Sequence, residues 1–170
     1  MIEASRATVR QGQAAGAVEL GIEHDKHRGI LSVEAAELAM ALPEAYAAVN
    51  RGNIETALSL MCHDVDWPNT VEGGREHGRD AVRAYWTRLF DLLVPRFDLL
   101  CVRAGHRGRL VVHAYQRFSD PATGQPLAHQ HVEHIFTLRN GLIGRMDATE
   151  LKLRGRGCGS PGCAQAARAM

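Results

Sequence analysis

The sequence predicts an α+β fold, with helices in its first half and antiparallel strands in its second half. In three segments between residues 32 and 93, apolar side chains recur with a period of about 3.6 residues, as on amphipathic helices. After residue 95, apolar and polar side chains alternate, as on half-buried strands. Asn140-Gly141 separates two of these alternating segments and is the strongest hairpin signal in the chain. A chain of 170 residues is long enough for one domain with a sizeable core.

The first predicted helix begins after Ser32, whose hydroxyl suits an N-cap, and Glu34 places a negative charge in its first turn. Apolar side chains then recur at helical spacing, at Leu38, Leu42, Tyr46 and Val49. Pro43 is expected to bend this helix, and Gly52 is expected to end it.

Two shorter helices and one short strand follow. Asn53 is expected to cap a second helix, whose apolar stripe is Ile54, Ala57, Leu58 and Met61. Residues 65–69 are predicted to form a strand, and residues 70–78 a loop with two adjacent glycines. A third helix is predicted over residues 80–93, with an apolar side made of Val82, Trp86, Leu89, Phe90 and Leu93.

The second half of the chain reads as four strands. They are predicted at residues 96–103, 109–118, 129–138 and 142–151. The sequence Ser-Asp-Pro-Ala-Thr-Gly at 119–124 marks the turn between the second and third of them. Helices followed by antiparallel strands predict helices packed on one face of a curved sheet.

Composition divides the chain into a flexible N-terminal arm (1–31), one domain (32–152) and a flexible C-terminal tail (153–170). The tail is rich in Gly, Arg and Ala, and its Cys158 and Cys163 lack a second ligand pair with zinc-like spacing. Cys62 and Cys101 stand in apolar patterns and are expected to be buried thiols.

The balance of charges argues against nucleic acid as a partner. The chain has 20 Lys and Arg, 19 Asp and Glu and a formal net charge of +1, whereas phosphate binding needs a basic surface. An uninterrupted apolar run of about 18 residues, as a membrane-spanning helix needs, is missing from the sequence. The N-terminal residues show no apolar region of the signal-peptide type, so a cytoplasmic location is expected.

Three short motifs carry a resemblance to a known superfamily. They are Asn-Arg-Gly at 50–52, Trp-Pro-Asn at 67–69 and Gly-Arg-Asp at 78–80. Together with the element order, residues 35–151 resemble the SnoaL-like and ketosteroid-isomerase-like cones of the NTF2-like superfamily. The resemblance implies three N-terminal helices packed on a curved mixed or antiparallel sheet around an apolar pocket. It further implies a homodimer formed through the outer sheet face, a small hydrophobic ligand and no cofactor.

The resemblance to ketosteroid isomerases assigns four functional positions. Counted without gaps, the general base of those enzymes falls on Asn69 and their oxyanion Tyr falls on Ala45, with Tyr46 pointing elsewhere. A supporting Tyr falls on Trp86 and the second acid falls on Glu133. Because an amide cannot accept the transferred proton, steroid dienol isomerisation is not predicted.

Limonene-epoxide hydrolases resemble the chain at the same strand. Their Tyr-x-Asn, which holds the attacking water, corresponds to Trp67-Pro68-Asn69. Asp147 is the nearest candidate for the catalytic Asp on their last strand. Strand alternation points Asp147 away from the cone unless a bulge shifts it. Their Arg-x-Asp has no counterpart in Val111-Val112-His113-Ala114-Tyr115, so epoxide hydrolysis by that mechanism is not predicted.

The remaining polar candidates lie on the later strands. His113 and Tyr115 share one face of their strand, and His131 and Glu133 share one face of theirs, while His134 faces the opposite way. If the first set faces the cone, a His beside a Glu suits a general base, as in SnoaL-type polyketide cyclases. The site prediction therefore depends on which face of this strand points into the cone.

On this reading the chain is a cofactor-independent acid/base enzyme, an isomerase, cyclase or hydrolase, acting on a small hydrophobic oxygenated substrate. The predicted catalytic residues are His131, Glu133, His113 and Asp147. The predicted substrate-binding residues are Trp67, Asn69, Tyr85, Trp86 and Tyr115. The alternative is a non-catalytic ligand-binding or dimerisation module.

The segment His129-x-His131-x-Glu133 carries three side chains of metal-binding type. Its three side chains share a strand face but spread over about 13 Å, too far for one ion. His131 and Glu133 with His113 are the nearest alternative set, and no metal is expected.

Overall fold

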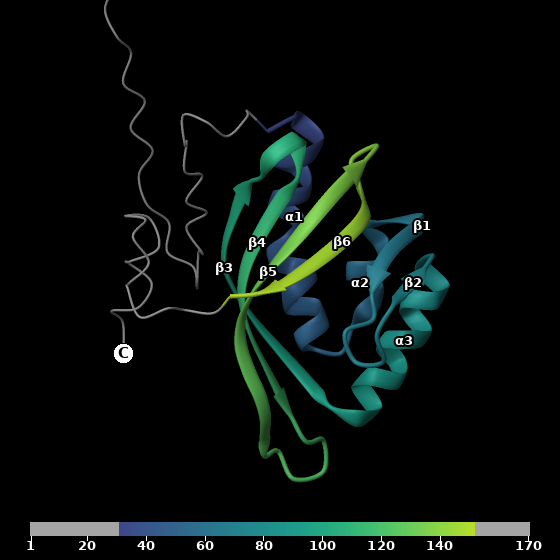
Figure 1. Ribbon diagram of the computed structural model, residues 1–170, viewed down its shortest axis with the longest axis vertical. Coiled ribbons are helices and arrows are strands. Elements are labelled where there is room, and N and C mark those ends of the chain that lie inside the picture. The colour runs from purple at the N-terminus through teal and green to yellow at the C-terminus, as the bar shows by residue number, and fades with distance from the viewer. Residues whose placement is uncertain (1–30, 152–170) are drawn as a thin grey trace, which may run out of the picture.

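The computed structural model describes residues 31–151 as one α+β domain (Figure 1). Its helices are α1 (Val33–Asn50), α2 (Ile54–Ser59) and α3 (Arg79–Leu92), with a short 3-10 turn η1 (His106–Gly108). Its strands are β1 (Met61–Pro68), β2 (Arg75–His77), β3 (Val94–Ala104), β4 (Leu110–Ser119), β5 (Pro126–Arg139) and β6 (Leu142–Glu150). The predicted arm, apart from Leu31, and the predicted tail lie outside the described residues.

The six strands form one curved sheet in the order β2-β1-β6-β5-β4-β3. Strand β1 runs parallel to β6, and every other neighbouring pair is antiparallel. Figure 1 shows α1, α2 and α3 on one side of this sheet. The predicted fold class, three helices on a curved mixed sheet, is confirmed.

Helix α1 begins and ends where the sequence predicts. The Ser32 hydroxyl accepts a hydrogen bond from the backbone N–H of Ala35 at 3.2 Å, and Gly52 takes a φ of 79° just after the helix. Pro43 lies inside the helix, which continues through it to Asn50. Asn53 occupies the N-cap position of α2, but its side chain makes no capping hydrogen bond.

The strands differ from the prediction at several points. Strand β1 begins four residues earlier than expected, and the predicted loop 70–78 contains the short strand β2, which pairs with the end of β1. Strand β3 begins at Val94, two residues before the predicted start at residue 96, and includes Pro95. Proline is tolerated there because β3 is an edge strand of the sheet.

The Asn-Gly hairpin joins β5 to β6 as predicted. Asn140 and Gly141 both take positive φ, 51° and 76°, which the two central residues of this tight turn require. This turn leads the chain from β5 directly back along β6, so the last four strands form an antiparallel meander.

The hydrophobic core lies between the sheet and the helices. Its largest fully buried side chains are Leu42, Leu58, Met61, Leu110, Val65, Val82 and Val112.

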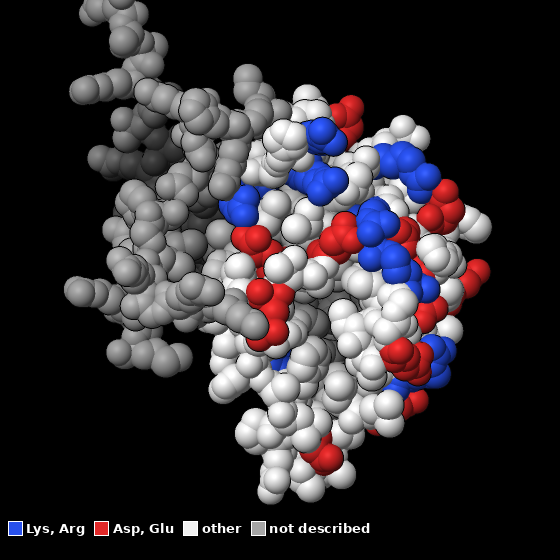
Figure 2. Space-filling view, viewed as in Figure 1, with Lys and Arg blue, Asp and Glu red and all other residues white. Residues whose placement is uncertain are grey.

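Figure 2 shows acidic and basic side chains intermixed on the face around β6 and β1. None of the described helices has the length and apolar character needed to cross a membrane.

Candidate functional site

A cavity remains between the sheet and the helices. It has an inner compartment of about 70 Å³ and a larger compartment of about 400 Å³. Both compartments are lined by Val49, Trp67, Trp86, Phe97 and His134, so they adjoin. The volume of the larger compartment falls in the range of small-molecule sites.

Aromatic side chains form much of the cavity wall. The rings of Trp67 on β1 and Trp86 on α3 meet edge to face, with centroids 5.2 Å apart. Phe90 stacks on Trp86 one helical turn later, at 6.3 Å. Strand alternation turns Trp67 inward together with buried Val65, and helical spacing aligns Trp86 with Val82 and Phe90. The predicted binding residues Trp67 and Trp86 therefore line the cavity.

Tyr46 and His134 provide the polar groups of the inner compartment. The Tyr46 hydroxyl oxygen lies 2.6 Å from Nδ1 of His134, and the two rings stack with centroids 5.9 Å apart. Every other described residue that lines this compartment is apolar or aromatic, and only Trp67 and Trp86 among them carry a polar group, the indole N–H. A hydrogen-bonded pair in such surroundings is strengthened by the low local dielectric.

The surroundings of this pair keep both groups uncharged. Burial lowers the pKa of His134 to about 4 and raises the pKa of Tyr46 above its usual value. His134 is only 7% exposed, so its imidazole is neutral at pH 7. Nδ1 is engaged by Tyr46, and Nε2 makes no hydrogen bond to the described part of the chain.

A neutral imidazole and a phenol in contact can bind one oxygen-bearing ligand in two ways. When Nδ1–H donates to the Tyr46 oxygen, the hydroxyl proton and the Nε2 lone pair remain for the ligand. When the hydroxyl donates to Nδ1, Nε2–H becomes the donor. The pair therefore offers one hydrogen-bond donor and one acceptor to the cavity in either arrangement.

Tyr85, which was predicted to bind substrate, lines the larger compartment. It is 4% exposed, and its hydroxyl oxygen lies 3.5 Å from Oγ1 of Thr70, a second residue of the same wall. Loop residue Val71 also contributes to this wall. The loop after β1 therefore borders the cavity.

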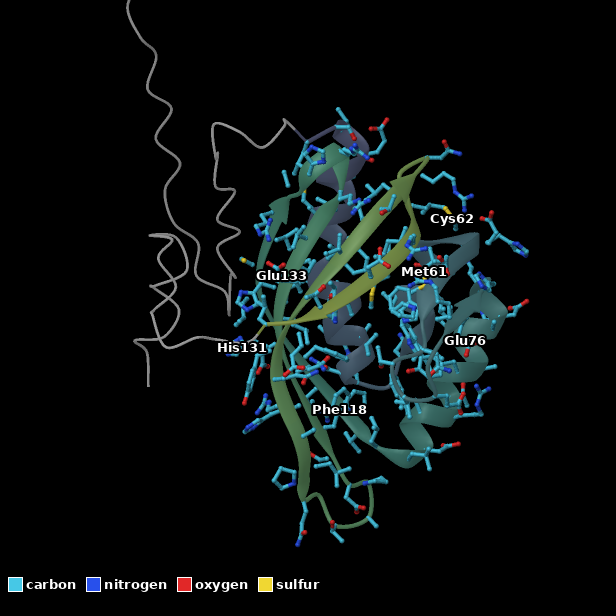
Figure 3. The ribbon with its side chains drawn as sticks, viewed as in Figure 1. Met61, Cys62, Glu76, Phe118, His131 and Glu133 are labelled. Atoms are coloured by element: carbon cyan, nitrogen blue, oxygen red, sulfur yellow. The ribbon has the colours of Figure 1, made fainter. Side chains whose placement is uncertain are left out.

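The sheet turns His113, Tyr115, His131 and Glu133 away from the cavity. Figure 3 shows His131 and Glu133 on the side of β5 opposite to the helices, while Phe118 points toward the helices. The residues of β5 that line the cavity are Gln130, Val132, His134 and Phe136. This corrects the inward orientation on which the predicted catalytic role of His113, His131 and Glu133 depended.

These outward residues interact with one another across β4 and β5. Nδ1 of His131 lies 3.3 Å from Nε2 of His113, and the Tyr115 ring lies 4.9 Å from the His131 ring. Arg103 donates to Glu133 at 2.6 Å. Partial burial lowers the pKa of His113, and the neighbouring His131 lowers it further.

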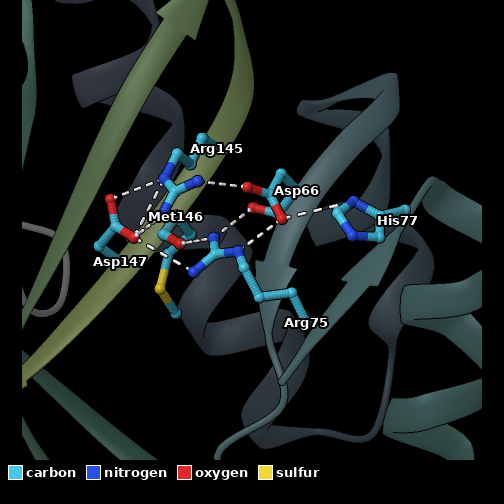
Figure 4. Close-up of polar contacts among 6 residues, drawn as sticks. All are labelled: Asp66, Arg75, His77, Arg145, Met146 and Asp147. Carbon is cyan, nitrogen blue, oxygen red and sulfur yellow. Dashed lines mark hydrogen bonds and ion pairs between the residues drawn. The ribbon is translucent and has the colours of Figure 1, made fainter.

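Asp147 also lies outside the cavity, as strand alternation predicts. It accepts hydrogen bonds from Arg145 and from Arg75, and Asp66 completes the network with both arginines (Figure 4). The hydrogen bonds from Arg145 are the main reason why the pKa of Asp147 is lowered. This carboxylate is held between two guanidinium groups and connects β6 to β2 through Arg75.

Asn69 is buried, but its amide is used within its own loop. The nitrogen donates to Glu72 at 3.0 Å and Glu76 at 2.9 Å, and the oxygen accepts from the backbone N–H groups of Val71 and Glu72. These bonds use both donor hydrogens and both lone pairs of the amide. Asn69 therefore has no capacity left to hold a water or a ligand, and it lines neither compartment.

The described residues include no group of three or more His, Cys, Asp or Glu side chains placed to hold a metal ion. The acidic and basic groups described above are paired with one another instead. The polar side-chain groups that the inner compartment presents, besides the indole N–H groups, are the Tyr46 hydroxyl and the His134 imidazole.

Comparison with known proteins identifies relatives of this arrangement. The family model of a SnoaL-like domain matches residues 43–146. No curated protein matches the chain.

Solved structures share the fold. An NTF2-like protein of unknown function from Burkholderia pseudomallei K96243 is 20% identical, with a TM-score of 0.58, and the match covers 71% of this chain and 92% of that chain. A proposed polyketide cyclase from Xanthomonas campestris pv. campestris is 26% identical, with a TM-score of 0.57 and coverage of 68% and 88%. TerC, co-crystallised with polyporic acid, is 22% identical, with a TM-score of 0.57 and coverage of 69% and 92%.

Proposed function

The chain belongs to the SnoaL-like family, of NTF2-like fold, and on that premise we propose that it is an acid/base enzyme acting on a small hydrophobic oxygenated molecule. The observation that carries this proposal is the 2.6 Å contact between Tyr46 and His134 inside an apolar cavity. Two similar structures support the class of ligand: one is described as a proposed polyketide cyclase, and the other was co-crystallised with polyporic acid.

The proposed reaction is removal of a proton from carbon beside a carbonyl group. His134 Nε2 takes the proton from the α-carbon, and the C–H electron pair becomes the new carbon–carbon double bond. The carbonyl π electrons move to the oxygen, where the Tyr46 hydroxyl donates a hydrogen bond to the developing charge. Return of the proton to another atom of the ligand completes an isomerisation or a ring closure. Side chains carry every proton, so the step needs no cofactor.

The low pKa of His134 defines which substrates suit this base. A general base with a conjugate acid of pKa about 4 removes only protons that are themselves acidic. Carbon acids activated by two carbonyl groups, or by one carbonyl and an aromatic ring, meet this requirement. The substrate is therefore proposed to be such an activated ketone.

The test is exchange of the activated protons of 2-tetralone for deuterium in D2O, followed by NMR. The protein is expected to accelerate exchange over buffer, and Tyr46→Phe and His134→Gln are each expected to slow it by about 100-fold or more. His129→Gln, an outward residue of the same strand, is the matched control and should retain full activity. Absence of acceleration by the folded wild-type protein would contradict the proposal.

A non-catalytic ligand-binding or dimerisation module is the second candidate. It is favoured by Asn69, because the amide at the position of the isomerase base is fully hydrogen-bonded within its own loop. In that case 2-tetralone would raise the melting temperature of the protein without exchange of its protons. The same sample therefore distinguishes the two functions.

We further propose that the protein forms a homodimer through the outer face of β3, β4 and β5. The rings of His113, Tyr115 and His131 lie together on this face, and no described helix packs on it. An isologous contact of two such faces would bury these rings in the middle of the dimer.

A further inference from the structure

Two amide side chains face each other in the larger compartment of the cavity. Gln116 on β4 and Gln130 on β5 are direct partners in the antiparallel register, so their side chains project from the same face of the sheet. Both residues are half-buried, and both line the larger compartment. The sheet thus brings two primary amides to one place on the cavity wall.

Neither amide side chain bonds to another residue of the described domain. Within the described part of the chain, the side chains of Gln116 and Gln130 make no hydrogen bond. The other amides that are at least partly buried are bonded: Asn69 binds its own loop, and Asn50 bonds both backbone groups of Phe97, at 2.9 and 2.8 Å. Each primary amide carries two N–H donors and an acceptor oxygen, which need partners when water is displaced.

The position of the amides gives the cavity two polar ends. Gln130 precedes His134 by four residues on the same strand face, which corresponds to about 13 Å along β5. Between them the strand contributes the apolar side chain of Val132, and the opposite walls carry Trp67 and Trp86. A ligand that contacts both ends therefore has an apolar middle, and the indole rings favour a flat aromatic one.

The charges along the cavity select against anions. None of the described residues that line the larger compartment is Lys or Arg, and Glu150 is the one charged residue among them. An anionic ligand would lose its hydration without gaining a counter-charge from the described lining, whose one charged residue, Glu150, has the same sign. A neutral ligand meets no such cost.

From these observations we propose that Gln116 and Gln130 form a second polar subsite. It recognises the far end of a neutral, flat two- or three-ring molecule that carries a hydroxyl or carbonyl oxygen at each end. One oxygen binds the Tyr46–His134 pair, and the other accepts from or donates to the two amides. This inference rests on the proposed function, because it assigns the near end of the ligand to Tyr46 and His134.

The test compares two probes that differ by one hydroxyl group. Naphthalene-2,6-diol has an oxygen at each end, whereas 2-naphthol has an oxygen at one end only. Binding of each is measured by titration calorimetry, or by quenching of Trp fluorescence, for the wild-type protein and for the double variant Q116M/Q130M. Methionine keeps the length of the side chain and removes its hydrogen-bonding groups. The matched control is R117M/H129M, the neighbouring register pair on the outer face of the sheet.

The diol is expected to bind the wild-type protein and the R117M/H129M control about tenfold more tightly than 2-naphthol does. In Q116M/Q130M the affinity ratio is expected to fall close to one, while the affinity for 2-naphthol stays the same. If both probes bind but the ratio is the same in the double variant, the subsite does not exist and the proposed function is unaffected. If neither probe binds the wild-type protein, the subsite and the proposed function are both wrong.

Discussion

The imidazole of His134 carries no charge at neutral pH because the fold surrounds it with apolar groups and one phenol. Its neighbours include aromatic rings of the same sheet, namely Phe97 on β3 at 6.0 Å and Phe136 on β5 at 6.4 Å between ring centroids. A charged imidazolium here would lose its hydration without an acidic partner. The native state therefore binds a proton at this site at a lower pH than an exposed histidine does.

This shift in pKa makes stability depend on pH. The unfolded chain protonates His134 near pH 6.5, whereas the native state protonates it near pH 4. Between these values the unfolded state binds more protons, so stability decreases as the pH falls from 6.5 to 4. The full contribution of His134 is up to about 3 kcal/mol of unfolding free energy. We expect His134→Gln to lack this part of the pH dependence, as measured by urea denaturation at pH 7.5 and at pH 4.5.

The comparison uses the change with pH, so a general loss of stability in the variant does not affect it. His129→Gln removes an exposed histidine from the same strand and should follow the wild-type pH dependence. An identical pH dependence in wild type and His134→Gln would show that the pKa of His134 is not lowered in the native state.

Tyr46 shows which kind of sequence argument worked at the scale of one residue. Helical periodicity places Tyr46 on the apolar stripe of α1 with Leu42 and Val49, and all three line the inner compartment. The ungapped count from ketosteroid isomerases places their oxyanion Tyr at Ala45 and predicts that Tyr46 points away from the pocket. The periodic signal was correct because it follows from the geometry of this helix, whereas the count depends on alignment across a different chain.

At the scale of elements, the sequence does not determine which of the two faces of β5 points into the cavity. Its inner row, Gln130 to Phe136, and its outer row, His129 to Ile135, each mix polar with apolar side chains. Alternation therefore predicts a strand but does not say which row faces the core. The apolar residues Val132 and Phe136 in the inner row, both buried, were the available signal. The predicted site was instead based on the histidines of the outer row.

Strand β1 pairs with β6 only in part, and Arg75 bridges the irregular region. Met61 pairs with Ile143 and Asp66 pairs with Arg145, so the register of the two strands shifts between these pairs. The Arg75 guanidinium donates to the Asp66 carboxylate at 2.5 Å and to the backbone carbonyl oxygens of Asp66 and Met146, at 3.1 and 2.6 Å. One side chain thus replaces backbone pairing between the strands (Figure 4).

We expect Arg75→Lys to lower the unfolding free energy by about 2 kcal/mol, because a single ammonium group cannot reach acceptors on both strands. The Arg75 side chain is 25% exposed, so solvent only partly replaces these bonds. Arg51→Lys, in an ion pair whose side chains are 60% and 68% exposed, is the matched control and should leave stability unchanged in urea denaturation. Equal stability of both variants would contradict the bridging role.

At the scale of the whole molecule, the order of helices and strands could be predicted because each has a local signal. The cap at Ser32, the turn at Asn140-Gly141 and the stripe of the third helix each depend on a few neighbouring residues. Strand β2 and the pairing of β1 with β6 lack such signals, since they depend on contacts between distant residues. The cavity depends on the same contacts, so its polar pair was not predicted.

The proposed homodimer gives a prediction at this scale. Tyr115→Glu would place a carboxylate at the centre of a two-fold contact, where it meets its symmetry mate. We expect this variant to sediment as a monomer in analytical ultracentrifugation at concentrations at which the wild-type protein is a dimer. Ala84→Glu, on the exposed side of α3, should remain dimeric. A wild-type protein that sediments as a monomer would overturn the proposed assembly.

The pairing of β1 with β6 has a consequence for the order of folding. Strands β3 to β6 follow one another through short connections, so their contacts close small loops, whereas joining residue 61 to residue 143 closes most of the domain. Loop-closure entropy favours formation of the meander first and docking of β1 and β2 last. The cavity is then completed only in the final step. A ligand bound in it slows unfolding and leaves the rate of folding nearly unchanged.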